Sequence, residues 1–206
     1  MNAQAVAHEV FRRVRPAMRP RGYRSKGSRL WRKAESGNIL TIQLQRSQAS
    51  TRDQVRLAVD YGVYSALLGS LYDDEPETLE VWRAHFRERV GTGPTEDWLV
   101  LSSGDSVDVA SDSLLRRCEE ADVVLTRFAS DQALRDEWLA GRAHGLSDLQ
   151  QGLFLAVLVS RLGPPEQLER VVKDLRQSPA YRTHHATIER ELTKAGIASP
   201  VSGPGR

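Results

Sequence analysis

One short stretch of the sequence holds residues that could act as a nucleophile. The segment Gly104-Asp105-Ser106 follows an expected strand, and some esterases place a catalytic serine there together with an Asp-x-x-His near the C-terminus. The histidine of that pair takes the proton of the serine. No aspartate of this chain is followed three residues later by a histidine. We therefore interpret Asp105 and Ser106 as a turn that leads into the next helix.

The histidines and carboxylates do not form the pattern of a metal centre. His85 and Glu88 lie one turn apart on an expected helix, but a metal ion needs three or four protein ligands. His184 and His185 are adjacent and project in different directions from a helix. The glycine-rich segment 91–94 lacks the Gly-Lys-Ser/Thr that would hold a phosphate. We expect neither a metal ion nor a cofactor, and no catalytic residue is assigned.

The only cysteine falls on the apolar face of an expected helix. Cys118 shares this face with Leu114 and Leu125, which favours a buried, inert thiol. A single cysteine excludes an internal disulfide, which fits a reducing compartment. Arg12 and Arg13 interrupt the early apolar stretch, and the longest apolar run is far shorter than the roughly 20 residues of a membrane span. We expect a soluble, cytoplasmic protein.

Two segments show the alternation of a half-buried sheet. Apolar residues recur at every second position of 38–47 and 55–64, for example at Leu40, Ile42 and Leu44. The intervening residues, and those of a further strand at 28–35, should share the opposite, polar face. This face combines amides, a carboxylate, guanidinium groups and aromatic rings, as a recognition surface does. The expected binding face comprises Arg29, Trp31, Gln43, Gln45, Arg56, Asp60 and Tyr64.

Two other interpretations of these polar residues stay open. A polar face is also what any half-exposed sheet presents to water. The segment 12–33 holds ten basic residues and no acidic one, although the net charge of the whole chain is only +2. Such a block is typical of nucleic-acid binding. Arginine makes up 25 of the 29 basic residues, however, so the block also reflects a general excess of arginine.

The apolar patterns place these residues on an α+β fold. Asn2 should cap a first helix that covers the apolar face of the sheet. A fourth strand is expected at 97–101, and a helix at 77–89 should bury Trp82 and Phe86. We expect about four antiparallel strands packed by helices, with a helical C-terminal part. The later helices are expected at 112–128, 130–141, 147–162, 166–177 and 180–195.

Five sequence blocks have the order and spacing of a known bacterial family. The blocks are Gly22-Tyr23-Arg24, Leu30-Trp31-Arg32, Ile42-Gln43-Leu44-Gln45-Arg46-Ser47, Tyr61-Gly62-Val63-Tyr64 and Phe86-Arg87-Glu88-Arg89-Val90-Gly91. In these blocks the chain resembles the domain-of-unknown-function family "forty-three-oh-four", over roughly residues 5–141. Tyr23 stands where the family usually has Phe. The resemblance implies an α+β fold and, because the family has no established activity, no catalytic residues.

These interpretations divide the chain into an α+β domain at 1–141, a helical extension at 142–196 and a disordered tail at 197–206. We favour a non-enzymatic protein-binding module, of the immunity or regulatory type, that uses the polar sheet face. One alternative is a nucleic-acid-binding protein that uses segment 12–33. The other is an enzyme whose site is assembled from residues far apart in sequence. Another protein is the expected partner, and no membrane is expected.

Overall fold

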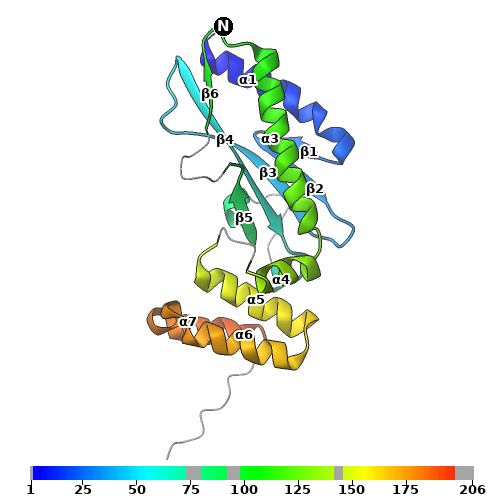
Figure 1. The fold of residues 1–206 in the computed structure, drawn as a ribbon, viewed down its shortest axis with the longest axis vertical. Coiled ribbons are helices and arrows are strands. Elements are labelled where there is room, and N and C mark those ends of the chain that lie inside the picture. The colour runs from blue at the N-terminus through cyan, green and yellow to red at the C-terminus, as the bar shows by residue number, and fades with distance from the viewer. Residues whose placement is uncertain (1, 73–79, 92–97, 142–145, 198–206) are drawn as a thin grey trace, which may run out of the picture.

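The computed structural model describes residues 2–72, 80–91, 98–141 and 146–197 (Figure 1). Within these residues the chain has an α+β fold, as the sequence predicts. An antiparallel sheet carries helices on one face, and further helices extend from one end of it (Figure 1).

Among the described residues the sheet has six strands, where about four were expected, and a long strand lies at its centre. β4 pairs with β3 along one edge, while β5 and β6 share its other edge. β2 and then β1 follow beyond β3. The strands are β1 (Arg24–Lys26), β2 (Arg29–Lys33), β3 (Ile39–Arg46), β4 (Gln54–Tyr64), β5 (Phe86–Arg89) and β6 (Leu99–Ser102).

The two faces of the sheet differ as the alternation predicts. A shift of one residue would move every side chain to the other face, so burial of one face fixes the register. The buried pairs of β3 and β4 are Leu40 with Val63, Ile42 with Tyr61 and Leu44 with Val59. The residues that point the other way and are exposed or half-buried include Gln43, Gln45, Arg56 and Asp60.

Two helices cover the buried face, α1 (Ala3–Ala17) and α3 (Val107–Arg127) (Figure 1). Asn2 caps α1 as predicted, because its Oδ1 accepts a hydrogen bond from the backbone amide of Ala5 at 2.9 Å. α3 begins before the predicted position 112, since the Ser106 hydroxyl caps it at the amide of Val109. α3 thus supplies the cover that was expected from a helix at 77–89.

A buried carboxylate ties α3 to the beginning of the sheet. Asp122 accepts hydrogen bonds from the Tyr23 hydroxyl at 2.8 Å and from Arg32 Nη2 at 3.0 Å. Arg21 Nη1 lies 3.3 Å from its second oxygen. Burial and the charge of Asp122 raise the pKa of Tyr23, which keeps the phenol protonated as a donor. Loss of either arginine would leave the buried carboxylate with fewer partners, which is costly.

Five further helices complete the described part of the chain. α5 packs against α2, α4, α6 and α7, so one hydrophobic core runs from the sheet into these helices. Ser130 and Ser147 cap α4 and α5 through the amides of Ala133 and Gln150. The helices are α2 (Ala66–Tyr72), α4 (Asp131–Leu139), α5 (Asp148–Leu162), α6 (Pro165–Gln177) and α7 (Pro179–Lys194).

The C-terminal end of the fold extends one residue into the predicted tail. Ile197 is buried, so the tail cannot begin at this residue, and positions 198–206 lie outside the described residues. Across the described ranges, we find no helix with the combined length and apolarity that crossing a membrane requires.

The predicted helix at 77–89 is wrong where the structure describes it, and its first three positions lie outside the described residues. Val81–Arg83 form a single turn of 3-10 helix (η2), and Phe86–Arg89 form β5. Beyond β5, the backbone amide of Val90 donates to the carbonyl of Val59 at 2.9 Å. Without these hydrogen bonds, backbone N–H and C=O groups at the edge of β4 would be left without a partner. The segment therefore pairs as a strand, although the spacing of its apolar residues also fits a helix.

This correction reverses the prediction for Trp82, which is 65% exposed. Phe86 is fully buried and its ring stacks on Phe128, with 4.3 Å between the ring centroids. We predict that Trp82→Ala changes the free energy of unfolding by about 0.5 kcal/mol or less. Phe86→Ala should cost about 3–5 kcal/mol, because it removes a core aromatic side chain. Urea denaturation measures both changes, and equal losses in the two variants would contradict these positions.

Gly62 marks a close approach of β4 to the segment around β5. A Cβ at this position would lie 2.6 Å from the Phe86 carbonyl oxygen and 2.7 Å from the Ala84 Cβ. Gly62→Ala should therefore destabilise the fold by about 1–3 kcal/mol, since the backbone must move. Gly69 in α2 is the control. Its Cβ would meet only His85 Cε1, at 3.9 Å, so Gly69→Ala should be neutral or stabilise by up to about 1 kcal/mol. An unchanged urea midpoint for Gly62→Ala would show that the approach is not tight.

Candidate functional site on the outer face of the sheet

Cross-strand pairing brings seven basic side chains to one face of the sheet. Residues that stand opposite each other in neighbouring strands share a face. One row therefore runs from β1 to β5 through Lys26, Arg29, Gln43, Asp60 and Arg89. We call the face that holds this row the outer face. Among the residues of the six described strands, Asp60 is its only acid, and its bases are Arg24, Lys26, Arg29, Lys33, Arg56, Arg87 and Arg89.

Six of the seven residues predicted for the binding face reach the surface of the outer face. Tyr64 is the exception, with an exposure of only 2%. Its hydroxyl donates a hydrogen bond to the Glu80 carbonyl, and its ring packs with Ile39 and Ala84. The segment that contains η2 therefore covers this end of the face, and Tyr64 supports the surface without forming part of it. The six exposed or half-buried residues are Arg29, Trp31, Gln43, Gln45, Arg56 and Asp60.

Arg89 was not predicted for the binding face, because its segment was assigned to a helix. Arg89 Nε donates to Asp60 Oδ1 at 2.7 Å, and Nη2 donates to Gln45 Oε1 at 2.7 Å. Its guanidinium carbon also lies 4.9 Å from the centroid of the Trp98 ring. Arg89 thus links three residues of the outer face in fixed positions. Phe86 and Val90 stand four positions apart, a spacing that fits a strand as well as a helix, and this is the signal that could have revealed it.

Hydrogen bonds and ring contacts also fix the middle of the outer face. Gln43 Oε1 accepts a hydrogen bond from the backbone amide of Val81 at 3.0 Å. The guanidinium carbon of Arg29 lies 4.8 Å from the centroid of the Trp31 ring. Trp31 also packs against the small buried cluster that includes Ala84. The polar groups of the face are therefore preorganised, and little of the Trp31 ring is open to a ligand.

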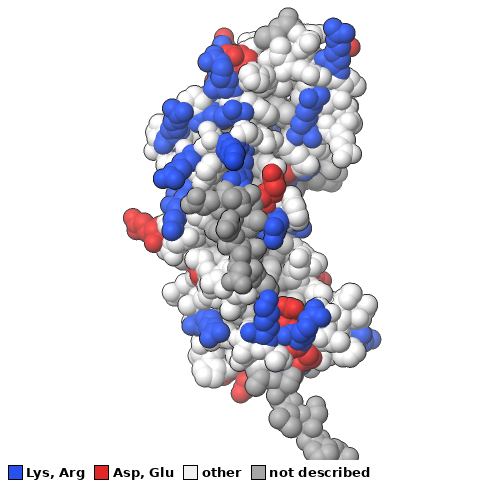
Figure 2. All heavy atoms as spheres, turned by 180° about the vertical axis from the view of Figure 1, so that it is seen from behind, with Lys and Arg blue, Asp and Glu red and all other residues white. Residues whose placement is uncertain are grey.

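Most charges at the surface of this part of the molecule are positive. Seen from behind, lysines and arginines predominate over acidic residues across the region that holds the sheet (Figure 2). Within the described residues, no carboxylate lies at salt-bridge distance from Arg24, Lys26, Lys33 or Arg56. Charges of one sign on a shared surface attract partners of the opposite sign. The outer face is suited to an anionic partner.

The basic segment 12–33 does not form one continuous surface. Arg12 and Arg13 lie 2.6 and 3.1 Å from Glu9, and their hydrogen bonds lower the pKa of Glu9 to about 2. Arg32 points to the other side of the sheet and pairs with Asp122. The members of the segment that reach the outer face are Arg24, Lys26, Arg29 and Lys33.

A family model described as "Domain of unknown function (DUF4304)" matches residues 14–128, more than half of the chain. The chain belongs to the DUF4304 family. The matched residues include all six strands and α3, so the outer face and the link through Asp122 both lie in the DUF4304 domain. Helices α4 to α7 lie beyond the match. Neither a curated protein nor a solved structure matches the chain.

The catalytic candidates of the sequence have structural roles in the DUF4304 domain. Ser106 caps α3, and Asp105 Oδ2 accepts a hydrogen bond from the amide of Ser102 at 2.6 Å, as a turn before a helix requires. His85 is buried, and its Nδ1 accepts a hydrogen bond from the amide of Ser65 at 3.0 Å. Among the residues that the structure describes, no three His, Cys, Asp or Glu side chains come together as a metal site.

Cys118 is fully buried in α3, as predicted. Burial, with a smaller contribution from the charge of Glu119, raises the pKa of its thiol from 9.0 to about 12. The folded chain therefore keeps the proton that the unfolded chain loses, and the stability from this group falls as the pH rises from 9 towards 12. We predict that iodoacetamide at about pH 8 modifies Cys118 quickly in denaturant and very slowly in the folded protein. Equal rates in both states would contradict the burial.

Proposed function

We propose that this DUF4304 protein is a non-enzymatic protein-binding module that docks an acidic surface of another protein on the outer face of its sheet. The observation that carries the proposal is the charge of this face, seven basic residues against one acidic residue in the described strands. Charges arranged in this way speed association with an acidic partner and reject basic ones. Regulatory and immunity-type proteins act by covering a partner surface, and the proposed role is of this kind.

The aromatic residues around the outer face support a protein partner. Tryptophan and arginine are the residue types most enriched at the energetic centres of protein interfaces. Three tryptophans on or beside this face each have an arginine guanidinium 4.8 to 5.9 Å from a ring centroid. The pairs are Arg29 with Trp31, Arg83 with Trp82 and Arg89 with Trp98.

The same contacts make nucleic acid the weaker candidate. Single-stranded nucleic acid binds to sheets by stacking its bases on open aromatic rings, whereas guanidinium groups already lie over these tryptophans. The division of segment 12–33 between two sides of the sheet removes the continuous basic patch on which the nucleic-acid hypothesis depended.

A photo-crosslinking amino acid on each side of the molecule tests the proposal. Val100 pairs with Arg56 on the outer face and is 42% exposed, and Val123 on α3 is 64% exposed. The two positions share a residue type and differ in the side of the sheet that they report. We predict that the probe at Val100 captures one defined protein in the cells in which this chain is made, and that the probe at Val123 does not. Capture of nucleic acid at Val100, or the same adducts at both positions, would contradict the proposal.

Charge reversal then tests the electrostatic basis with the captured protein. Lys26→Glu combined with Arg56→Glu should weaken its binding by roughly tenfold or more, and higher salt should slow association. Arg116→Glu combined with Arg170→Glu changes the net charge equally on exposed helix positions and should leave the affinity unchanged. Isothermal titration gives both affinities, and stopped-flow mixing gives the rates. Equal weakening by the two double variants would show that net charge alone attracts the partner.

A further inference from the structure

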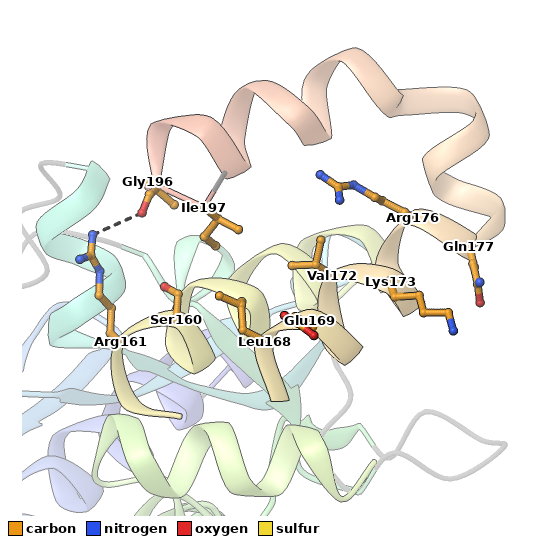
Figure 3. Close-up of a pocket in the computed structure, with 11 residues that line it drawn as sticks. Ser160, Arg161, Leu168, Glu169, Val172, Lys173, Arg176, Gln177, Gly196 and Ile197 are labelled. Atoms are coloured by element: carbon orange, nitrogen blue, oxygen red, sulfur yellow. Dashed lines mark hydrogen bonds between the residues drawn. The ribbon is translucent and has the colours of Figure 1, made fainter. Parts of the chain in front are cut away.

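A separate hollow lies among the three C-terminal helices (Figure 3). It has a volume of about 750 Å³ and is lined by the end of α5, by α6 and by the residues that follow α7. Small-molecule sites commonly have volumes of about 300–1,000 Å³. The match to the DUF4304 family ends at residue 128, so the hollow is a feature of the helices that lie beyond the family's domain.

The hollow exists because α6 and α7 are joined tightly at one end only. Ser178 alone separates the two helices, and its hydroxyl caps α7 at the amide of Tyr181. Arg176 holds the helices together through two hydrogen bonds to Glu189, at 2.7 and 2.8 Å. The backbone of α7 is non-helical at His184, which bends this helix. The space therefore remains between α6 and the residues that follow α7.

The centre of the hollow is apolar and its ends are polar. Leu168 and Val172 of α6 and Ile197 after α7 line the central part (Figure 3). Arg161 lies at one end, where its Nη2 donates to the carbonyl of Ala195 at 3.3 Å (Figure 3). Lys173 and Gln177 lie towards the other end (Figure 3). A ligand that fills this space would need an apolar body with a polar group at an end.

The charges of the lining favour an anionic group over a cationic one. Among the described lining residues, Arg161, Lys173 and Arg176 are basic and only Glu169 is acidic. The charge of Arg176 is already balanced by Glu189. For Lys173, no described residue provides a hydrogen bond or an ion pair. Lys173 is exposed, so its ammonium group can pair with a carboxylate at this end of the hollow without first breaking another ion pair of a described residue. A small multivalent anion would meet mostly apolar surface.

We propose that this hollow binds a small amphipathic carboxylate. Its apolar body lies on Leu168, Val172 and Ile197, and its carboxylate pairs with Lys173. The site shares no lining residue with the outer face of the sheet, so the binding of a small molecule here and the docking of a protein there are separate properties.

Decanoate, below the concentration at which it forms micelles, is the probe, and decanol is the matched uncharged ligand. Isothermal titration should show one decanoate site, and the methyl resonances of Val172 and Ile197 should shift on binding. Lys173→Glu should weaken decanoate by roughly tenfold, since it removes a charged partner and adds repulsion. Arg170→Glu, on the same helix but outside the lining, should leave the affinity unchanged. Leu168→Trp, which fills the hollow, should abolish binding, and circular dichroism confirms that this variant folds.

Several results would overturn the proposal. One is the absence of saturable decanoate binding, and another is that the resonance shifts are confined to the sheet. A third is that decanol and decanoate bind with equal affinity and that Lys173→Glu changes neither affinity. Sedimentation supplies one more outcome. The parent protein could show a mass that rises to that of a dimer with concentration, while Leu168→Trp keeps the mass of a monomer. This result would show that a second copy of the chain occupies the hollow, and it would also overturn the small-molecule site.

Discussion

The antiparallel pairing of β3 with β4 is the interaction on which the rest of the structure depends. Every residue of β3 pairs with β4, and the period of two places apolar side chains on one face and polar ones on the other. A shift of one residue would bury Gln43 and Asp60 and expose Ile42, which costs both polar desolvation and lost apolar burial. The same alternation therefore specifies the core under α1 and α3 and the basic outer face.

The direction of each arginine decides whether it stabilises the fold or contributes to the surface. Trp31 and Arg32 are neighbours in the sequence, yet Trp31 lies on the outer face under Arg29, and Arg32 reaches Asp122 on the inner side. A buried ion pair contributes little net stability, but the loss of one partner leaves an expensive charge behind. The inner arginines, Arg21 and Arg32, thus serve to pair the buried Asp122. On the outer face, Arg24, Lys26, Lys33 and Arg56 have no carboxylate partner among the described residues and contribute their charge to the surface.

Local patterns predicted much of this fold. The alternation in β3 and β4 predicted the correct face for Gln43, Gln45, Arg56 and Asp60, and the cap of α1 was predicted from Asn2. Both signals come from neighbouring residues, so a single sequence contains them.

The parts that the sequence did not predict depend on distant residues. The segment of β5 has apolar residues at both helical and strand spacing, and only the unpaired edge of β4, more than twenty positions earlier, decides between them. Arg89 was lost from the predicted face for this reason. The pairing of Arg32 with Asp122, 90 residues later, could not be predicted from local sequence either. Segment 12–33 was therefore interpreted as one basic patch. Tyr64 was placed on the surface because nothing local shows that η2 covers it.

The central claim is that the outer face binds a partner while the helical side holds the fold together. Hydroxyl-radical footprinting of the chain alone and in complex with its captured partner tests this claim most directly. Oxidation of the exposed Trp82 and Val100, which lie on or beside the outer face, should fall severalfold in the complex, whereas oxidation of the exposed Val109 and Val123 on α3 should be unchanged. Protection of the α3 side with unchanged oxidation of Trp82 and Val100 would contradict the claim.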